Sequence, residues 1–423
     1  MKNAVPRPSL GPPNLAALVV AAALLFPACG GDDSSAATHP GPGDAGVDAA
    51  RSTDGGTAGD AGADAADAGG GGGDSGSPGD AGTGDGPAAA GLHVEGNKLV
   101  DGGKVVRLLG VDHAGSEWAC VGSAGTNGYA FFDGPSDATL VTPMLAWKIN
   151  AVRLPLNEEC WLGINGVNPT YAGSNYQTAI ANLVALFRSH GMYVILDLHW
   201  GAPGASIGTS QQPMANADHS LALWKSVASK FKGDLGVVFD VFNEPYLAAG
   251  NVSGGTDPWS CLQSGCTATL QTPLTGTYQT AGMQALVDAV RSTGARNVVM
   301  VAGLAYTSDL SGWLAHKPMD ATGNLVASVH LYNFNGCTDA TCWNQRYAAI
   351  AASVPIITGE NGENDCAHGF VDGYMTWADG LGISYLGWSW NALDCSSFPA
   401  LITDYAGTPS GFGAGLKAHL LSL

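Results

Sequence analysis

Two glutamates stand where apolar stretches of the sequence stop. Glu244 follows the apolar run 237–242 within Asn243-Glu244-Pro245, and Glu360 follows the run 354–359. Pro245 has no N–H to donate to a β-ladder, so a strand must end there. Two carboxyl groups can cleave a glycosidic bond, because one protonates the leaving oxygen while the other attacks the sugar or activates water. The two residues are therefore the first candidates for catalysis.

The elements that must position these residues are strands alternating with helices. Apolar runs cover 107–111, 151–156, 193–198, 237–242, 297–301, 326–331, 355–358 and 384–388, and helical patterns follow at 138–148, 176–190, 217–231, 280–293, 308–316, 344–352, 371–380 and 413–421. This alternation implies a parallel sheet. A doubly wound open sheet is the competing architecture, but no glycine-rich phosphate loop follows the first strand. We predict an α/β fold, a (β/α)8 TIM barrel, entered through a short hairpin over 92–106.

Polar and aromatic residues gather at the predicted strand ends. In a (β/α)8 barrel the active site lies at the C-terminal ends of the strands. Those ends carry Asp112-His113, Arg153, His199-Trp200, Asn243-Glu244, His330, Tyr332, Glu360, Trp388 and Trp390. Any one of them alone fits a core position, but so many at one rim indicate a site. Glu244 and Glu360, three strands apart, should face each other across the barrel mouth.

With these residues in view, the sequence resembles glycoside hydrolase family 5 over residues 91–423, most clearly in Asn243-Glu244-Pro245 and its preceding apolar strand. The resemblance implies that Glu244 is the acid/base and Glu360 the nucleophile of a retaining enzyme. It also implies supporting roles for residues near the pair. Arg153 orients the nucleophile, Asn243 holds the sugar 2-hydroxyl, and His330 and Tyr332 form the His-x-Tyr pair whose tyrosine contacts the nucleophile. His199 is the strand-three histidine, Trp200 contacts substrate, and Trp390 or Trp388 lies beneath the bound sugar.

The residues after Glu360 depart from the family pattern. The family usually has an aromatic residue and then Gly after the nucleophile, whereas here Asn361-Gly362 follows. Glu363 stands close enough to be confused with the nucleophile. We assign the nucleophile to Glu360 because it directly ends the strand, and expect Glu363 to be a loop residue or hydrogen-bond partner.

The two glutamates are expected to differ in pKa. Retention requires carboxyl groups about 5–5.5 Å apart. The negative charge of Glu360 should raise the pKa of Glu244, so that Glu244 holds a proton near neutral pH. Arg153 should supply the positive charge that keeps Glu360 ionised.

The first 90 residues differ in composition from the rest. Residues 1–29 are typical of an export signal, in which Lys2 and Arg7 precede an apolar run at 15–26 and Cys29 follows Ala28 as in a lipoprotein box. We expect lipidation at Cys29, with ordinary signal cleavage as the alternative. Residues 30–90 contain 19 Gly, 15 Ala and 11 Asp, which predicts a disordered linker. The predicted order is signal 1–29, linker 30–90 and catalytic domain 91–423, in an exported protein that is a cell-surface lipoprotein or secreted.

The cysteine count agrees with export. Of nine cysteines, eight remain if Cys29 is lipidated, and an even number in an exported chain indicates disulfides. Cys261–Cys266 and Cys337–Cys342 are close enough to staple loops, which leaves Cys120–Cys160 and Cys366–Cys395 as remaining pairs, although eight cysteines allow 105 pairings. No CxxC or HxxxH spacing supports a zinc site, so no metal is predicted.

Charge narrows the partners. The net charge of −19 argues against nucleic acid or an anionic membrane surface as the main partner. We expect a monomer that binds polysaccharide, needs no cofactor and meets the membrane only through the anchor at Cys29. Three functions stay open: a retaining endo-β-glycosidase, with cellulose or a related β-1,4-glucan as the leading substrate, a non-catalytic surface carbohydrate-binding protein, and a glucan transglycosylase. The presence of both glutamates argues against the binding protein.

Overall fold

The computed structural model describes residues 91–122, 129–396 and 398–423. The predicted signal at 1–29 and linker at 30–90, including the expected lipidation at Cys29, lie outside the described residues. Within the described part of the chain, no helix combines the length and apolar character needed to span a membrane.

Eight parallel strands close into a barrel, as predicted. In chain order they are β4 (Leu109–Asp112), β5 (Ala151–Asn157), β6 (Tyr193–Trp200), β7 (Val237–Asp240), β10 (Val299–Ala302), β11 (Leu325–Tyr332), β12 (Ile356–Gly362) and β13 (Ser384–Gly387). Each pairs with the next, and β13 pairs with β4 to close the ring. Nearly every residue of these strands is buried, as expected for parallel strands covered on both faces.

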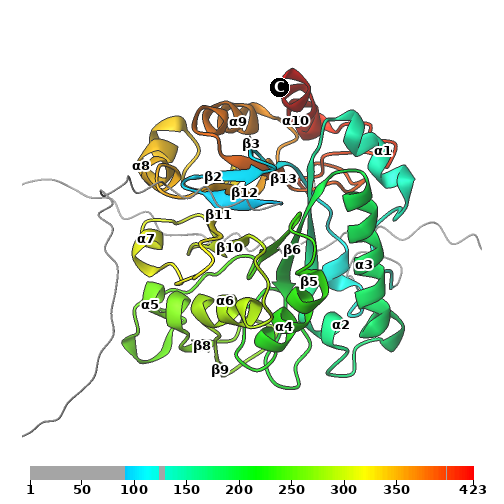
Figure 1. Cartoon of the computed structure of the whole chain (residues 1–423). Helices are drawn as coiled ribbons and strands as arrows, with labels where there is room; N and C mark the ends of the chain where they lie inside the picture. Colours follow the sequence, from blue (N-terminus) through cyan, green and yellow to red (C-terminus); the bar gives the residue numbers. More distant parts are fainter. Residues whose placement is uncertain (1–90, 123–128, 397) are drawn as a thin grey trace, which may run out of the picture. The chain divides into compact units, whose positions relative to one another are not determined.

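A helix follows each barrel strand and covers the outside of the ring (Figure 1). These helices are α1 (Ala138–Ala146), α3 (Ser174–Ser189), α4 (Ser220–Phe231), α6 (Met283–Arg291), α7 (Trp313–His316), α8 (Ala340–Ala351), α9 (Gly369–Leu381) and α10 (Gly411–Ser422). All eight were predicted. In α6, for example, Met283, Leu286, Val287 and Val290 form the buried face, at the spacing of an amphipathic helix. This arrangement confirms the (β/α)8 barrel.

The entrance to the barrel domain is a three-stranded antiparallel sheet rather than a simple hairpin. It comprises β1 (His93–Glu95), β2 (Lys98–Asp101) and β3 (Lys104–Val106). Gly102 and Gly103, both at positive φ, make the second turn. Leu92 and Leu99 pack with apolar residues near the starts of the barrel strands, among them Val238. The N-terminal end of the barrel is therefore apolar, which leaves the polar residues to the other end.

Short elements that the sequence did not indicate are inserted in the loops after the strands. They are α2 (Glu158–Leu162), α5 (Pro258–Ser264) and the hairpin of β8 (Thr267–Thr269) and β9 (Thr277–Gln279), together with three short 3-10 turns at Ser116–Trp118, Pro169–Tyr171 and Ser253–Gly255. These elements are too short for a helical or strand period to be recognised in the sequence.

Four disulfides fix these loops, and all four have the predicted pairing. They are Cys120–Cys160, Cys261–Cys266, Cys337–Cys342 and Cys366–Cys395. Cys120–Cys160 joins the loop after β4 to α2, and Cys366–Cys395 joins the loops after β12 and β13. Both therefore connect loops at the polar end of the barrel.

Removing Cys120–Cys160 should destabilise the domain more than removing Cys261–Cys266. The first pair is separated by 40 residues and the second by 5. Loop-closure entropy assigns about 4 kcal/mol to the longer loop and about 2 kcal/mol to the shorter. We expect Cys120→Ala/Cys160→Ala to lower Tm further than Cys261→Ala/Cys266→Ala in calorimetry of the full chain. Equal losses, or the opposite order, would contradict this expectation.

Candidate active site

Arg153 on β5 forms the centre of the site. Its guanidinium is fully buried and donates to Oε1 of Glu360 at 2.9 Å and to Oδ1 of Asn243 at 2.7 Å. Carboxylates from three more strands surround it, with Asp112 at 3.0 Å, Asp240 at 3.1 Å and Asp197 at 3.3 Å. Burial alone would lower the pKa of Arg153, but these carboxylates together hold it well above its ordinary value. The side chain therefore remains a cation.

One arginine cannot balance four buried carboxylates. Burial and the neighbouring acids raise the pKa of Asp112 well above its ordinary value and that of Asp240 to about 8, against the opposing effect of Arg153. Both shifts favour the protonated form of Asp112 and Asp240. No role was predicted for Asp197 or Asp240. Each aspartate lies inside an otherwise apolar run, 193–198 or 237–242. A charged residue in such a run needs a buried counter-ion, and this pattern could have identified both.

Glu360 is held from two sides. Arg153 contacts one carboxylate oxygen, and the Tyr332 hydroxyl donates to the other at 2.5 Å. Burial and the nearby Glu360 and Glu244 raise the pKa of Tyr332 well above its ordinary value, so the phenol keeps its proton and remains a donor. Both contacts fix the position of the Glu360 side chain.

A bulge in β12 sets the direction of Glu360. Val329 pairs with Thr358 and His330 pairs with Glu360, which leaves Gly359 without a partner on β11. A Cβ at Gly359 would lie 2.8 Å from Nε2 of His330. Glycine is therefore required where β12 passes the imidazole.

Glu244 lies beyond the end of β7 with its side chain 17% exposed. Its Oε1 is 2.9 Å from Nδ1 of His330. Burial raises the pKa of Glu244 to about 7, although the cations His199 and Arg153 act to lower it. The direction agrees with the expectation from sequence, but the main cause is burial rather than the charge of Glu360.

The two glutamates lie close together. A carboxylate oxygen of Glu244, a carboxylate oxygen of Glu360 and a ring nitrogen of His330 are all within 4.8 Å of one another. This donor set is of a kind that can hold a divalent cation, but the guanidinium of Arg153 already supplies a positive charge beside Glu360. The short separation suits a carboxyl pair acting on one bond.

The two histidines of the site differ in charge. Burial lowers the pKa of His330 to about 4, so its ring is neutral. Burial also acts to lower the pKa of His199, but Asp197 at 3.1 Å, with Glu117 and Glu360, raises it to about 9. The ring of Trp388 stacks on that of His199, with centroids 5.4 Å apart and planes 8° from parallel. A protonated imidazole on an indole face is a favourable cation–π arrangement.

The tryptophans divide between mouth and core. Trp388 packs beside Tyr332 and Trp118, and Trp200 lies 6.0 Å from Trp118 between ring centroids. Trp390 is not brought to this group, because its ring is fully buried and packs edge-on against Trp147 at 4.8 Å. Of the two alternatives for the strand-eight tryptophan, the structure places Trp388 at the site.

Two further aromatic pairs lie on the loops after the neighbouring strands. Tyr246 and Tyr306 stack with centroids 4.7 Å apart, and Phe334, which is 59% exposed, stacks on Tyr332 at 4.9 Å. Aromatic faces at a polar rim suit the apolar C–H faces of sugars. Tyr246, two residues after Glu244, was visible in the sequence, but its partner 60 positions away was not.

Glu363 has a structural task, as expected. Its Oε1 accepts the backbone N–H of Val371, in the first turn of α9, at 2.9 Å, and its side chain is buried. A carboxylate in this place satisfies a helix N–H that has no partner within the helix. Within the described part of the chain, it forms no hydrogen bond or ion pair with Glu244 or Arg153.

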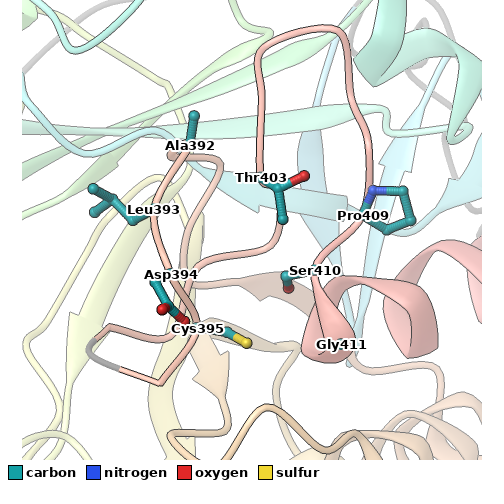
Figure 2. A pocket seen from close by; sticks show the side chains of 8 residues that line it. All are labelled: Ala392, Leu393, Asp394, Cys395, Thr403, Pro409, Ser410 and Gly411. Carbon is teal, nitrogen blue, oxygen red and sulfur yellow. The ribbon is translucent and has the colours of Figure 1, made fainter.

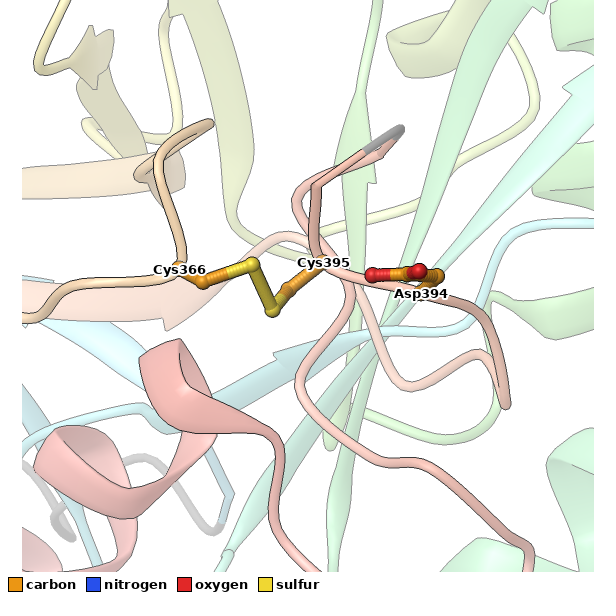
Figure 3. A group of neighbouring side chains, drawn as sticks. All are labelled: Cys366, Asp394 and Cys395. Carbon is orange, nitrogen blue, oxygen red and sulfur yellow. A yellow bond between two sulfur atoms is a disulfide. The ribbon is translucent and has the colours of Figure 1, made fainter.

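A pocket of about 550 Å³ between β13 and α10 is separate from these residues (Figure 2). Asp394 and Ser410 line it, and among the described residues its lining includes neither Glu244 nor Glu360. Cys395, also on its wall, is bonded to Cys366 (Figure 3). Asp394 and these two sulfurs lie close enough to suggest a metal site, but sulfurs in a disulfide are not thiolate ligands.

The sequence matches the profile of the Cellulase family, glycosyl hydrolase family 5, over residues 111–394. It is 24% identical over 316 residues to the mannan endo-1,4-beta-mannosidase of Streptomyces lividans, covering 72% of this chain and 67% of that protein. It is 28% identical over 173 residues to an endoglucanase of Microbulbifer, covering 41% of this chain and 27% of the relative. The chain therefore spans about a quarter of that endoglucanase.

Solved structures show the same fold. A beta-glucanase from Saccharophagus degradans in complex with cellotetraose superposes with a TM-score of 0.56 at 19% identity, covering 79% of this chain and 93% of that one. The catalytic domain of the major endoglucanase from Xanthomonas campestris gives a TM-score of 0.55 at 20% identity, covering 77% of this chain and 98% of that one.

The raised pKa values predict how stability depends on pH. Burial raises the pKa of Glu117, Glu159 and Glu244 to about 7 and of Asp240 to about 8. In an unfolded chain such groups ionise near pH 4, so at pH 6.5–8 only the folded protein holds these protons. Folding therefore weakens as pH rises through this window. His199, with its raised pKa, acts in the same direction.

We expect Tm at about pH 6.5 to exceed Tm at about pH 8 in thermal unfolding followed by calorimetry. His113 and His330, whose pKa burial lowers to about 4, oppose this trend mainly below about pH 6.5. There the unfolded imidazoles take up protons that the folded ones exclude. A Tm that stays level or rises between the two pH values would contradict the assignment of protonated buried acids.

Proposed function

Because the chain belongs to glycosyl hydrolase family 5, we propose that it is a retaining endo-β-glycosidase that hydrolyses a β-1,4-linked glucan, with Glu360 as nucleophile and Glu244 as acid/base. One observation carries the proposal. Two carboxylate oxygens within 4.8 Å belong to groups with opposite surroundings, one beside a buried cation and one with a pKa raised to about 7. Inverting enzymes instead leave about 6.5–9.5 Å between the carboxyls for a water molecule.

In the first step, Glu360 attacks the anomeric carbon while Glu244 gives its proton to the leaving oxygen. The glycosidic bond breaks as an ester forms between the sugar and Glu360. Arg153 and Tyr332 hold the attacking carboxylate, and Asn243, itself fixed by Arg153, is available for the sugar 2-hydroxyl. Each contact exists before substrate binds, so no reorganisation is required.

In the second step, Glu244 acts as a base. It takes a proton from a water molecule, whose oxygen attacks the anomeric carbon and releases Glu360 as a carboxylate. The neutral imidazole of His330 meets Glu244 through Nδ1 at 2.9 Å, and donates to the carboxylate when that nitrogen carries the ring proton. Glu244 begins and ends the cycle protonated.

The substrate class is proposed from the relatives and the aromatic rings. The names of the similar proteins refer to β-glucan, cellulose fragments and mannan. The rings of Trp388, Trp200 and Tyr306 offer flat faces suited to extended β-linked chains. A β-1,4-glucan remains the leading substrate, and the mannosidase relative, which covers most of this chain, makes mannan the second candidate.

We also propose export, to the cell surface or to the medium. The four disulfides support it, because such bonds persist in oxidising compartments. The signal, the linker and the lipid anchor at Cys29 stay predictions, as they lie outside the described residues.

A reducing-sugar assay of the exported protein tests the proposal. Substrates are carboxymethyl-cellulose, mixed-linkage glucan, mannan, xylan and laminarin. Loss of a residue that acts with others in one site costs on the order of 10³-fold or more in kcat, so Glu360→Gln and Glu244→Gln should each lose nearly all activity on the polymer that is cleaved.

Glu363→Gln is the matched control and should stay within about twofold, because it alters a buried glutamate outside the catalytic pair. Full activity of Glu360→Gln on the cleaved polymer would sink the proposal. No cleavage of any polymer, with binding retained, would indicate the carbohydrate-binding protein instead.

A further inference from the structure

The segment that carries Glu244 is held by its carbonyl groups. Residues 243–245 lie beyond the end of β7, yet each carbonyl accepts a hydrogen bond from another loop. The Thr307 hydroxyl donates to Asn243 at 2.8 Å, Gln211 donates to Glu244 at 2.5 Å, and the Tyr306 N–H donates to Pro245 at 3.0 Å. The donors come from the loops after β6 and β10, on either side of β7 in the barrel.

Thr307 also connects Glu244 to its imidazole partner. While its hydroxyl holds Asn243, its own carbonyl accepts the backbone N–H of His330 at 3.2 Å. The ring of His330 then meets Glu244 at 2.9 Å. Fully buried, Thr307 thus fixes the backbones on both sides of the Glu244–His330 contact.

The backbone at Thr307 is one that threonine disfavours. Ala305, Tyr306 and Thr307 have φ values of +52°, +56° and +60°, three successive non-glycine residues in the left-handed region. A β-branched residue is a marked outlier there, and glycine or asparagine would make the turn with less strain. What threonine supplies is a hydroxyl, and here that hydroxyl is used on Asn243. Strain of this kind persists where the surrounding contacts over-determine the conformation.

We propose that Thr307 is a positioning residue, which uses its hydroxyl to hold Asn243 and thereby sets the place of Glu244 relative to His330 and Glu360. The inference rests on the proposed function, since it assigns a role in placing the acid/base. Thr307 touches neither sugar nor reacting atoms in this scheme. It acts through the backbone of residue 243, next to the glutamate.

Thr307→Val keeps the shape and branching of the side chain and removes only the hydroxyl. A misplacement of about 1 Å can cost 10²-fold in rate, so we expect kcat on the cleaved polymer to fall about 10–100-fold with KM within about threefold. Thr307→Ser restores the hydroxyl and should recover kcat to within about threefold. A residue needed only for packing would not respond in this way, because Val packs at least as well as Ser.

The pH profile supplies a second readout. Burial raises the pKa of Glu244, so a glutamate that moves toward solvent should lose part of this shift. The alkaline limb of kcat should therefore move to lower pH in Thr307→Val. The charged and titratable groups that face Glu244 are the same in both proteins, and are Arg153, His199, Asp197, Glu360, His330, Tyr306 and Tyr332.

Two more variants keep the test decisive. Thr280→Val removes another buried threonine hydroxyl, which bonds only the backbone and sulfur atoms of the Cys261–Cys266 loop, and should keep kcat and the pH profile unchanged. Gln211→Met removes the donor to the Glu244 carbonyl from a partly exposed position, and should lower kcat as Thr307→Val does. Because the Gln211 side chain also acts to lower the pKa of Glu244, its loss should not move the alkaline limb to lower pH. Gln211→Met replaces Thr307→Val as the test if Tm and circular dichroism show that Thr307→Val does not fold.

The outcomes separate this inference from the proposed function. If Glu244→Gln is inactive while folded Thr307→Val keeps kcat within twofold and an unchanged pH profile, the positioning role is overturned and the proposed function stands. If Thr307→Val does not fold, a kcat of Gln211→Met within twofold of the unmodified protein overturns the positioning role in the same way. If Glu244→Gln itself remains fully active, the proposed function fails, and the positioning role fails with it.

Discussion

The pairing of one buried cation with carboxylates from four other strands governs this structure. Arg153 on β5 meets Asp112 on β4, Asp197 on β6, Asp240 on β7 and Glu360 on β12. A charge inside a barrel is tolerated only when it is paired and hydrogen-bonded. Each strand must therefore pair in the register that brings its carboxylate to Arg153. The apolar plug of β1–β3 at the other end leaves this layer as the floor of the site.

The same layer gives two similar side chains unlike properties. Glu360 lies against Arg153 and accepts a hydrogen bond from the Tyr332 hydroxyl. Glu244 lies against a neutral imidazole, and burial disfavours its charged form. In the proposed reaction this difference is what separates nucleophile from acid. The bulge at Gly359 and the clamped carbonyls of residues 243–245 then bring the two groups within reach of one bond.

Much of the fold could be predicted because strands buried on both faces are continuous apolar runs that end abruptly. The same ends predicted Arg153, Tyr332, Glu244 and Glu360. Local pattern could not supply partners distant in sequence, such as Asp240 for Arg153, 87 positions away. It also could not choose between Trp388 and Trp390. Alternation along a strand would put both on one face, but β13 ends at Gly387, so the alternation no longer applies and one ring turns into the core.

The most direct measurement is to trap the covalent intermediate. A 2-deoxy-2-fluoro glycoside of the cleaved sugar, with a dinitrophenyl leaving group, slows release of the sugar more than its attachment. Intact-protein mass spectrometry followed by peptide mapping would then locate the label. The account predicts one sugar per chain, bonded to Glu360, and no label in Glu360→Gln. A label on Glu363 or Glu244, or rapid turnover with inverted product and no label at any time, would contradict it.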